Sequence, residues 1–413
     1  MHRVASVGVL WALCCATTAA DAQDVPVSFE AAVALAARNP RVLQGHRGSA
    51  LLRRAAETSP PVDANPQITV TGGARVTPAG EQGFEGSVGV SQSFSVQGVA
   101  GLRRAALSDE SRWMGAEADA ETLTRRLAAA NAWLALREAE EQLSLAESAI
   151  ANEARFVDLV TRLAAGGERT AGDVAAASVG LEEARMRGRL AEGAIADARW
   201  AAAAEIGTPE RGALVTEGPA PELPAPSERE RQLAFEGVAS LPSVRSRRLL
   251  ARVEATRALE ERATRGTRLT LGVEARRDAL TAGVVQATVA VPLPFFAVGD
   301  REFAARRAAA LRMEGEADAE AVRAAAELRL AAHDVEHSTE VYDALVANLL
   351  PASERAVALR ERQLTVGEGT ILDVLDARRS LVDARIRWVR AAHDRTSARL
   401  RWSVLAQAAR RGE

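Results

Sequence analysis

The 413-residue sequence predicts an α+β fold in which one long unit occurs twice, each copy combining a β-hairpin with long helices. The first observation is an internal repeat, because the eight residues that begin at Gly167 (GERTAGDV) return at Gly367 as GEGTILDV. The second is strict alternation of apolar and polar residues in four short segments, which predicts β-strands. The third is a heptad pattern in long segments poor in proline and glycine, which predicts extended helices. The repeat is too long for a common solenoid and indicates a pseudo-symmetric shape.

The N-terminal segment predicts export. Basic residues at the start precede an apolar run at 4–16, and small residues stand at Ala20 and Ala22. This is the pattern of a secretory signal peptide, so we assign residues 1–22 to it, with cleavage after Ala22 and Ala20 as the alternative. A retained anchor is disfavoured because the run is too short to span a bilayer.

Composition excludes several classes of function. Both cysteines, Cys14 and Cys15, lie in the signal segment, so disulfides and cysteine–metal sites are excluded from the mature chain. A net charge of −3 argues against a nucleic-acid partner. No other segment has the apolar length of a spanning helix, so entry into a membrane would require strands.

The first copy is assigned to residues 23–215 and opens with short helices. Ser28 is placed to cap the first helix, and Asn39-Pro40 interrupts it. Beyond Ser59-Pro60-Pro61 the apolar period changes to two. The elements expected here are the short helices, a β-hairpin at about 67–94, a long helix at about 99–165 and a return helix at about 170–206.

A proline-rich linker at 216–227 leads to the second copy, residues 228–413. The same order of elements is expected there, with Pro351 kinking or restarting the long helix. The elements are short helices, a β-hairpin at about 268–293, a long helix at about 301–364 and a return helix at about 370–408. A helix of this length reaches on the order of 100 Å, and alanine at many heptad positions predicts a wall of helices.

The strand pattern predicts oligomerisation. Two hairpins supply four strands, and an isolated four-stranded sheet cannot hide its edges or close in lipid. Three chains would supply twelve strands, enough for a closed barrel. The expected fold class is therefore an α+β membrane protein whose four strands per chain join a trimeric transmembrane β-barrel, continued by a long α-helical barrel. The polar positions Thr69, Thr71, Ser87, Ser91 and Ser93 would face the lumen, and Ile68, Val70, Leu269, Leu271 and Val289 the lipid.

The order of elements, the segment 349–354 (LLPASE) and above all 366–377 (VGEGTILDVLDA) resemble the TolC family of outer-membrane efflux proteins. The resemblance covers nearly the whole mature chain. It implies a passive, trimeric exit duct without cofactor or enzymatic activity, which crosses the outer membrane of a Gram-negative bacterium and extends into the periplasm. It also implies a periplasmic adaptor (membrane fusion) protein and an inner-membrane pump as partners.

The resemblance further implies a channel constriction at Asp373 and Asp376, which lie one helical turn apart. Threefold repetition would form carboxylate rings that attract cations; the alternative is two helix-start acids stabilised by the helix dipole. Because Gly369 has no side chain to tie neighbouring tips, we hypothesise an ion pair of Arg169 with Asp173 or Asp373. Adaptor contacts implied at the tips are Ala165, Gly166, Gly167, Val366, Gly367 and Thr370.

Two other sequence patterns give weaker support for a function. His333 and His337 belong to an H-x-x-E-H sequence, a zinc-peptidase pattern, but a solvated helix face is the favoured interpretation and no metal is expected. Phe94, Phe295 and Phe296 stand at strand ends, where an aromatic girdle would lie. The helical tryptophans are expected to pack: Trp113, Trp133, Trp200, Trp388 and Trp402.

The main alternative function is a soluble periplasmic coiled-coil adaptor or scaffold. Such an adaptor would usually have one helical hairpin with more strands, whereas this sequence predicts two helical hairpins and few strands. Metal ions, drugs and a secreted protein are all compatible with the sequence as transported cargo.

Overall fold

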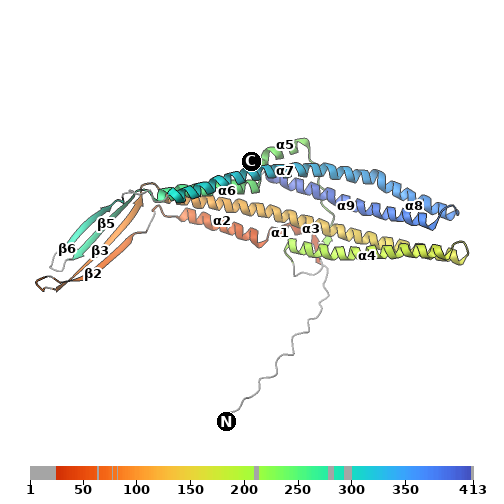
Figure 1. Cartoon of the computed structure of the whole chain (residues 1–413), viewed down its shortest axis with the longest axis horizontal. Helices are drawn as coiled ribbons and strands as arrows, with labels where there is room; N and C mark the ends of the chain where they lie inside the picture. Colours follow the sequence, from red (N-terminus) through yellow and green to blue (C-terminus); the bar gives the residue numbers. More distant parts are fainter. Residues whose placement is uncertain are drawn as a thin grey trace, which may run out of the picture. The chain divides into compact units, whose positions relative to one another are not determined.

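The computed structural model describes residues 25–62, 65–76, 78–80, 82–208, 214–277, 283–292 and 300–410. The expected signal segment 1–22 and both Phe295 and Phe296 lie outside these ranges. The chain divides into two compact units, each assembled from segments of both sequence copies (Figure 1). Unit 1 comprises Met1–Ala37, Arg125–Ala225 and His333–Arg401, and unit 2 comprises Arg38–Thr124, Pro226–Ala332 and Trp402–Glu413.

Unit 1 is helical with one small parallel sheet. Val25 pairs with Leu214, although the two strands belong to opposite ends of the first copy. Trp133 is fully buried, donates its indole N–H to the Val27 carbonyl at 2.7 Å and meets the Phe29 ring edge-on at 5.5 Å. Its elements are β1 (Val25–Ser28), α1 (Phe29–Ala36), α4 (Ala171–Ile206), β4 (Leu214–Glu217), α8 (Leu350–Thr365), and parts of α3 (Val99–Ala165), α7 (Asp300–Ala344) and α9 (Ile371–Arg410).

Local sequence signals set several helix boundaries. The Ser28 hydroxyl caps α1 by accepting from the Ala31 N–H at 3.2 Å. Gly207 ends α4 in the left-handed conformation, with φ of 85°. At Leu345–Leu349 α7 gives way to one π-helical turn, and Pro351 occupies the first turn of α8, where its missing N–H is tolerated.

Unit 2 contains a second helical core. Leu241 and Val244 at the start of α6 pack with Ala324 and Ala409, which come from α7 and α9. Asp109 is buried and accepts hydrogen bonds from Arg252 and Thr256. The helices of this unit are α2 (Pro40–Thr58), α5 (Glu228–Glu236), the 3₁₀ turn η1 (Gly237–Ser240), α6 (Pro242–Thr264), and the remaining parts of α3, α7 and α9.

Unit 2 also carries an antiparallel four-stranded sheet in the order β2-β3-β5-β6 (Figure 1). The central pair, β3 and β5, joins the two sequence copies, with Phe94 opposite Leu269. Among the described strands, β2 and β6 are the outer ones, and each pairs with another strand along one edge only. The strands are β2 (Gln67–Val76), β3 (Gln82–Ser95), β5 (Arg268–Arg277) and β6 (Gly283–Ala290).

The two faces of this sheet differ in chemistry. On one face Thr71 and Ser87 hydrogen-bond at 2.6 Å, and Ser93 and Thr270 at 2.8 Å. The other face carries large apolar side chains that no described part of the chain covers; Ile68 is 72% exposed. Exposed apolar residues on this face are Ile68, Val70, Val76, Phe84, Val88, Val90, Phe94, Leu271, Val273, Val285 and Val289.

The expectation that every tryptophan packs fails within the single chain for Trp200, which is 71% exposed on α4. Trp402, by contrast, is buried and meets Phe235 edge-on at 6.1 Å. Heptad position alone did not separate these cases, because a seam between helices of one chain and a seam between chains have the same periodicity.

Candidate functional site: the helical tips

Both helical hairpins of unit 1 turn through the same backbone geometry. Gly167 and Gly367 adopt φ of 80° and 81°, a conformation that favours glycine. In each turn the next residue bonds back across the helix end: the Glu168 N–H donates to the Leu163 carbonyl, and the Glu368 N–H to that of Gln363, both at 2.9 Å. These bonds satisfy carbonyls at the helix C-terminus, so the turns close compactly.

Each return helix starts with a threonine–aspartate capping box. The Asp173 N–H donates to the Thr170 hydroxyl oxygen at 3.2 Å, while its carboxylate accepts from the Thr170 N–H at 2.9 Å. Thr370 and Asp373 repeat the arrangement at 3.2 Å and 3.1 Å. Reciprocal bonds of this kind satisfy two otherwise free N–H groups and stabilise the helix start.

The capping bonds also change the acidity of both carboxyls. Hydrogen bonds from the Thr170 backbone and then its side chain lower the pKa of Asp173. For Asp373 the Thr370 hydroxyl contributes most to a lowered pKa, followed by the Thr370 backbone N–H. Each bond favours the ionised carboxylate, so both groups carry negative charge at neutral pH.

The predicted constriction residues have different roles within the chain. The Asp373 carboxylate is held by its own helix start, as the helix-dipole alternative requires. Asp376 is exposed, and its nearest cation is Arg379 at 3.6 Å. Within the chain, Asp376 is therefore the less constrained of the two carboxylates.

Arg169 ties the first tip to the second hairpin. Its Nη2 donates to the Leu364 carbonyl at 2.8 Å, close to the end of α8. Its charge also favours ionisation of Asp173, as the smallest contribution to that lowered pKa. The hypothesised ion pair with Asp173 or Asp373 is thus replaced within one chain by a hydrogen bond to backbone, and stays a prediction for the assembled protein.

The local structure explains why glycine occupies position 369. A Cβ at this position would lie 3.0 Å from the Leu364 nitrogen and 3.1 Å from the Gln363 Cβ. Its N–H also donates to the Gln363 carbonyl at 3.0 Å. The second tip therefore folds tightly back on α8, and a side chain at the position where the first copy has Arg169 would crowd the backbone of that helix.

A compact apolar cluster supports both tips. Its buried members come from α3, α4, α8 and α9, so one core holds the two hairpins together. They are Phe156, Val160, Ala177, Leu364, Ile371, Val374 and Leu375.

Arg378 is the residue beneath the tips that sequence analysis missed. Its Nη2 lies 2.7 Å from a Glu361 carboxylate oxygen, and its Nη1 lies 3.7 Å from Glu153. The guanidinium also lies over the Phe156 ring, 4.3 Å from its centroid. No sequence pattern links these residues, because they come from three separate helices. Burial is the main cause of a raised pKa at Glu153, whose Oε2 has no hydrogen-bond partner.

The histidine pair lies on the exposed surface of α7. The rings of His333 and His337 stack with centroids 6.0 Å apart, while Val335 between them is buried. Among the described residues no group of three or more candidate ligands is arranged to hold a metal ion. The geometry is that of a solvated helix face.

Within the described ranges, no helix has a stretch both long and apolar enough to cross a lipid bilayer.

Residues 239–405 match the family described as Outer membrane efflux protein. No protein with a curated description matches the sequence.

Three solved structures have a similar fold. A membrane protein from Pseudomonas aeruginosa is 18% identical with a TM-score of 0.76, over 92% of this chain and 90% of that one. The outer membrane protein VceC of Vibrio cholerae is 18% identical with a TM-score of 0.74, over 92% and 96%. The MtrE outer membrane channel of Neisseria gonorrhoeae, in its open state, is 20% identical with a TM-score of 0.71, over 92% and 88%.

Proposed function

We propose that this chain, an outer membrane efflux protein by the family match of residues 239–405 and by its fold, forms the exit duct of a tripartite efflux or secretion system. The match confirms the resemblance that the segment 366–377 indicates. The duct lies in the outer membrane of a Gram-negative bacterium and extends into the periplasm. It is a passive conduit and not an enzyme.

The open sheet supports a trimeric barrel. Strands β2 and β6 each leave backbone donors and acceptors unpaired, which lipid does not tolerate. Three such sheets, joined edge to edge, supply twelve strands and remove every edge. The face that carries Ile68 and Val70 would then contact lipid, and the face that carries Thr71 and Ser87 would line the lumen.

The helices offer a second line of support for assembly. Large apolar side chains are exposed on α4 and α8 of the single chain, among them Trp200 at 71%. Contiguous exposed apolar surface marks interaction sites on folded proteins. Neighbouring subunits would cover these residues, which are Val179, Met186, Leu190, Trp200 and Leu359. The two copies, 23–215 and 228–413, would give each subunit a pseudo-two-fold repeat.

The tips are the proposed meeting point with the rest of the system. The glycine turns present Ala165 to Gly167 and Val366 to Gly367, with Thr370 beside them, to a periplasmic adaptor that joins the duct to an inner-membrane pump. Asp376, and Asp373 behind its capping bonds, would form the constriction in the trimer. Rings of carboxylates favour cations over anions.

Planar-bilayer recording of detergent-extracted protein tests the proposal. We expect a trimer in solution and discrete conductance steps, with Asp376→Asn lowering cation selectivity. Arg169→Ala is expected to raise conductance if the tip ion pair forms between subunits. A monodisperse, detergent-free protein that carries no current would refute the duct and favour the soluble adaptor.

A further inference from the structure

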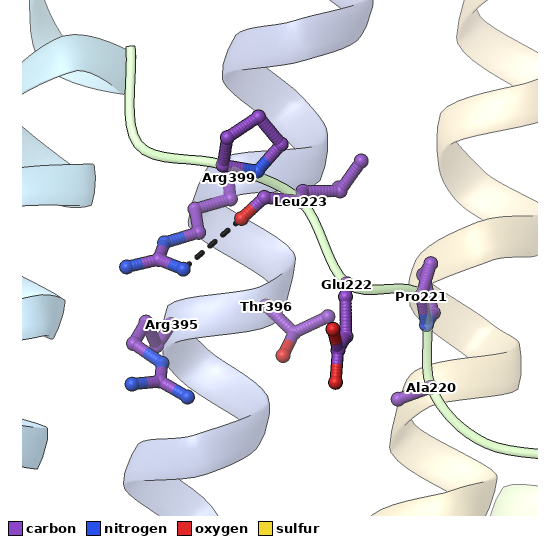
Figure 2. Close-up of a pocket in the computed structure, with 8 residues that line it drawn as sticks. Ala220, Pro221, Glu222, Leu223, Arg395, Thr396 and Arg399 are labelled. Atoms are coloured by element: carbon purple, nitrogen blue, oxygen red, sulfur yellow. Dashed lines mark hydrogen bonds between the residues drawn. The ribbon is translucent and has the colours of Figure 1, made fainter.

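A pocket lies in unit 1 where the linker between the two copies crosses α9 (Figure 2). Its volume is about 560 Å³, within the roughly 300–1,000 Å³ of pockets that bind small molecules. The linker forms one wall and three polar side chains of α9 form the other. The lining residues are Ala220, Pro221, Glu222, Leu223, Pro224, Arg395, Thr396 and Arg399.

Two arginines of α9 face this pocket. Arg395 and Arg399 are one helical turn apart, and Figure 2 shows both guanidinium groups on the same side of the helix. Like charges at this spacing repel each other, so the arrangement costs stability unless a negative group lies nearby. The pair is therefore poorly explained as packing alone.

Arg399 is only partly satisfied by the protein. Its Nη1 donates to the Leu223 carbonyl at 3.0 Å, and its Nη2 to the Thr339 hydroxyl at 3.4 Å. Its Nε is buried and has no hydrogen-bond partner. Burial, and secondarily the charge of Arg395, lowers the pKa of Arg399, although an arginine stays protonated at neutral pH.

Arg395 is held by an aromatic ring. Its guanidinium lies over Tyr342 at 3.7 Å from the ring centroid, which fixes its plane while leaving its N–H groups free to donate. Among the described residues it has no hydrogen bond or ion pair. A guanidinium fork held in this way is preorganised, because little side-chain entropy remains to be lost on binding.

The acidic groups near Arg395 and Arg399 neutralise the positive charge of the two side chains only in part. Glu222 lines the pocket from the linker, but it is exposed and forms no ion pair with Arg395 or Arg399 in the described structure. Asp343 of α7 acts on Arg399 only through its charge. The pocket thus combines two oriented cations with unfilled space.

We propose that this pocket binds a small oxyanion, a molecule with a carboxylate or phosphate group that both guanidinium groups contact. The planar fork of arginine matches both groups in bidentate geometry, and charge-assisted hydrogen bonds are stronger than neutral ones. Partial burial of Arg399 strengthens them further. The bound anion would link the inter-repeat linker to α9, since Leu223 is already bonded to Arg399.

Calorimetric titration of the detergent-solubilised full-length protein tests this site, with citrate and inorganic phosphate as probes at constant ionic strength. We expect saturable binding of at least one probe, and the stronger one identifies the preferred group. Arg395→Gln should weaken binding about tenfold or more, as expected for a lost hydrogen bond to a charged group. Arg387→Gln, which changes an exposed arginine elsewhere on α9, should leave binding unchanged.

Glu222→Gln separates a binding role from a structural one. Glu222 is the one acidic residue among the described residues that line the pocket, so its replacement should strengthen anion binding, whereas a packing defect would weaken it. Arg399→Gln can disturb the linker, so Arg395→Gln carries the test if that variant does not fold. The absence of saturable binding, or equal affinity in wild type and Arg395→Gln, would overturn the proposal. Neither result depends on whether the protein conducts ions.

Discussion

Replacement of Arg378 by alanine should loosen the tips. The side chain joins α9 to Glu361 of α8 through contacts at 2.7 and 3.1 Å, and lies over Phe156 of α3 at 4.3 Å. A partly exposed ion pair contributes up to about 1 kcal/mol, and a cation–π contact about as much. The variant also leaves the half-buried Glu153 without its nearest cation. We expect a total loss of about 2 kcal/mol in the free energy of local opening.

Amide hydrogen exchange is the suitable assay, because it reports local opening of the helices around the tips without requiring global unfolding. A loss of about 2 kcal/mol corresponds to roughly 30-fold faster exchange of the protected amides around Phe156. Arg355→Ala is the matched control, since Arg355 is exposed on α8 and its Nε donates to the carbonyl of Pro351 in the same helix. Unchanged exchange in a folded Arg378→Ala variant would show that these contacts do not hold the helices together.

Three further predictions concern caps, burial and metal. Thr370→Ala should destabilise the second tip by about 1 kcal/mol. Because the pKa of Asp373 is lowered in the fold, its stabilisation is present above its unfolded pKa of about 3.9 and is lost as pH falls through the folded pKa. The melting temperature of Thr370→Ala should therefore fall less steeply with decreasing pH than that of the wild type. Equal slopes for the two proteins would contradict this prediction. Burial raises the pKa of Glu153, so the ionised carboxylate opposes folding at neutral pH. Glu153→Gln should therefore raise the melting temperature at pH 7. This advantage should vanish below the pKa that Glu153 has in the unfolded chain. Elemental analysis should find no stoichiometric zinc; bound zinc that His333→Ala removes would restore the metal interpretation.

Patterns in the sequence anticipated features that arise from one stretch of chain. Alternation from Gln67 places Ile68 and Val70 on one face, because successive strand residues point to opposite sides. Ser28 and Pro351 act on their own helices, since a cap or a missing N–H has its effect within one turn. The capping boxes at Thr170 and Thr370 follow the same rule, because each joins residues three positions apart.

Pairings between distant segments required the tertiary structure. The parallel pair of Val25 and Leu214, the pair of Phe94 and Leu269, and the network of Arg378 each join segments that no local pattern connects.

The sequence by itself determined the kinds of element and their approximate limits, because periodicity, caps and turn glycines are encoded residue by residue. Only the tertiary structure decided which arginines form ion pairs with carboxylates, which tryptophan is exposed in the single chain and which side chains line the linker pocket. Those outcomes depend on the three-dimensional packing of helices far apart in sequence, where partners are chosen by distance and burial.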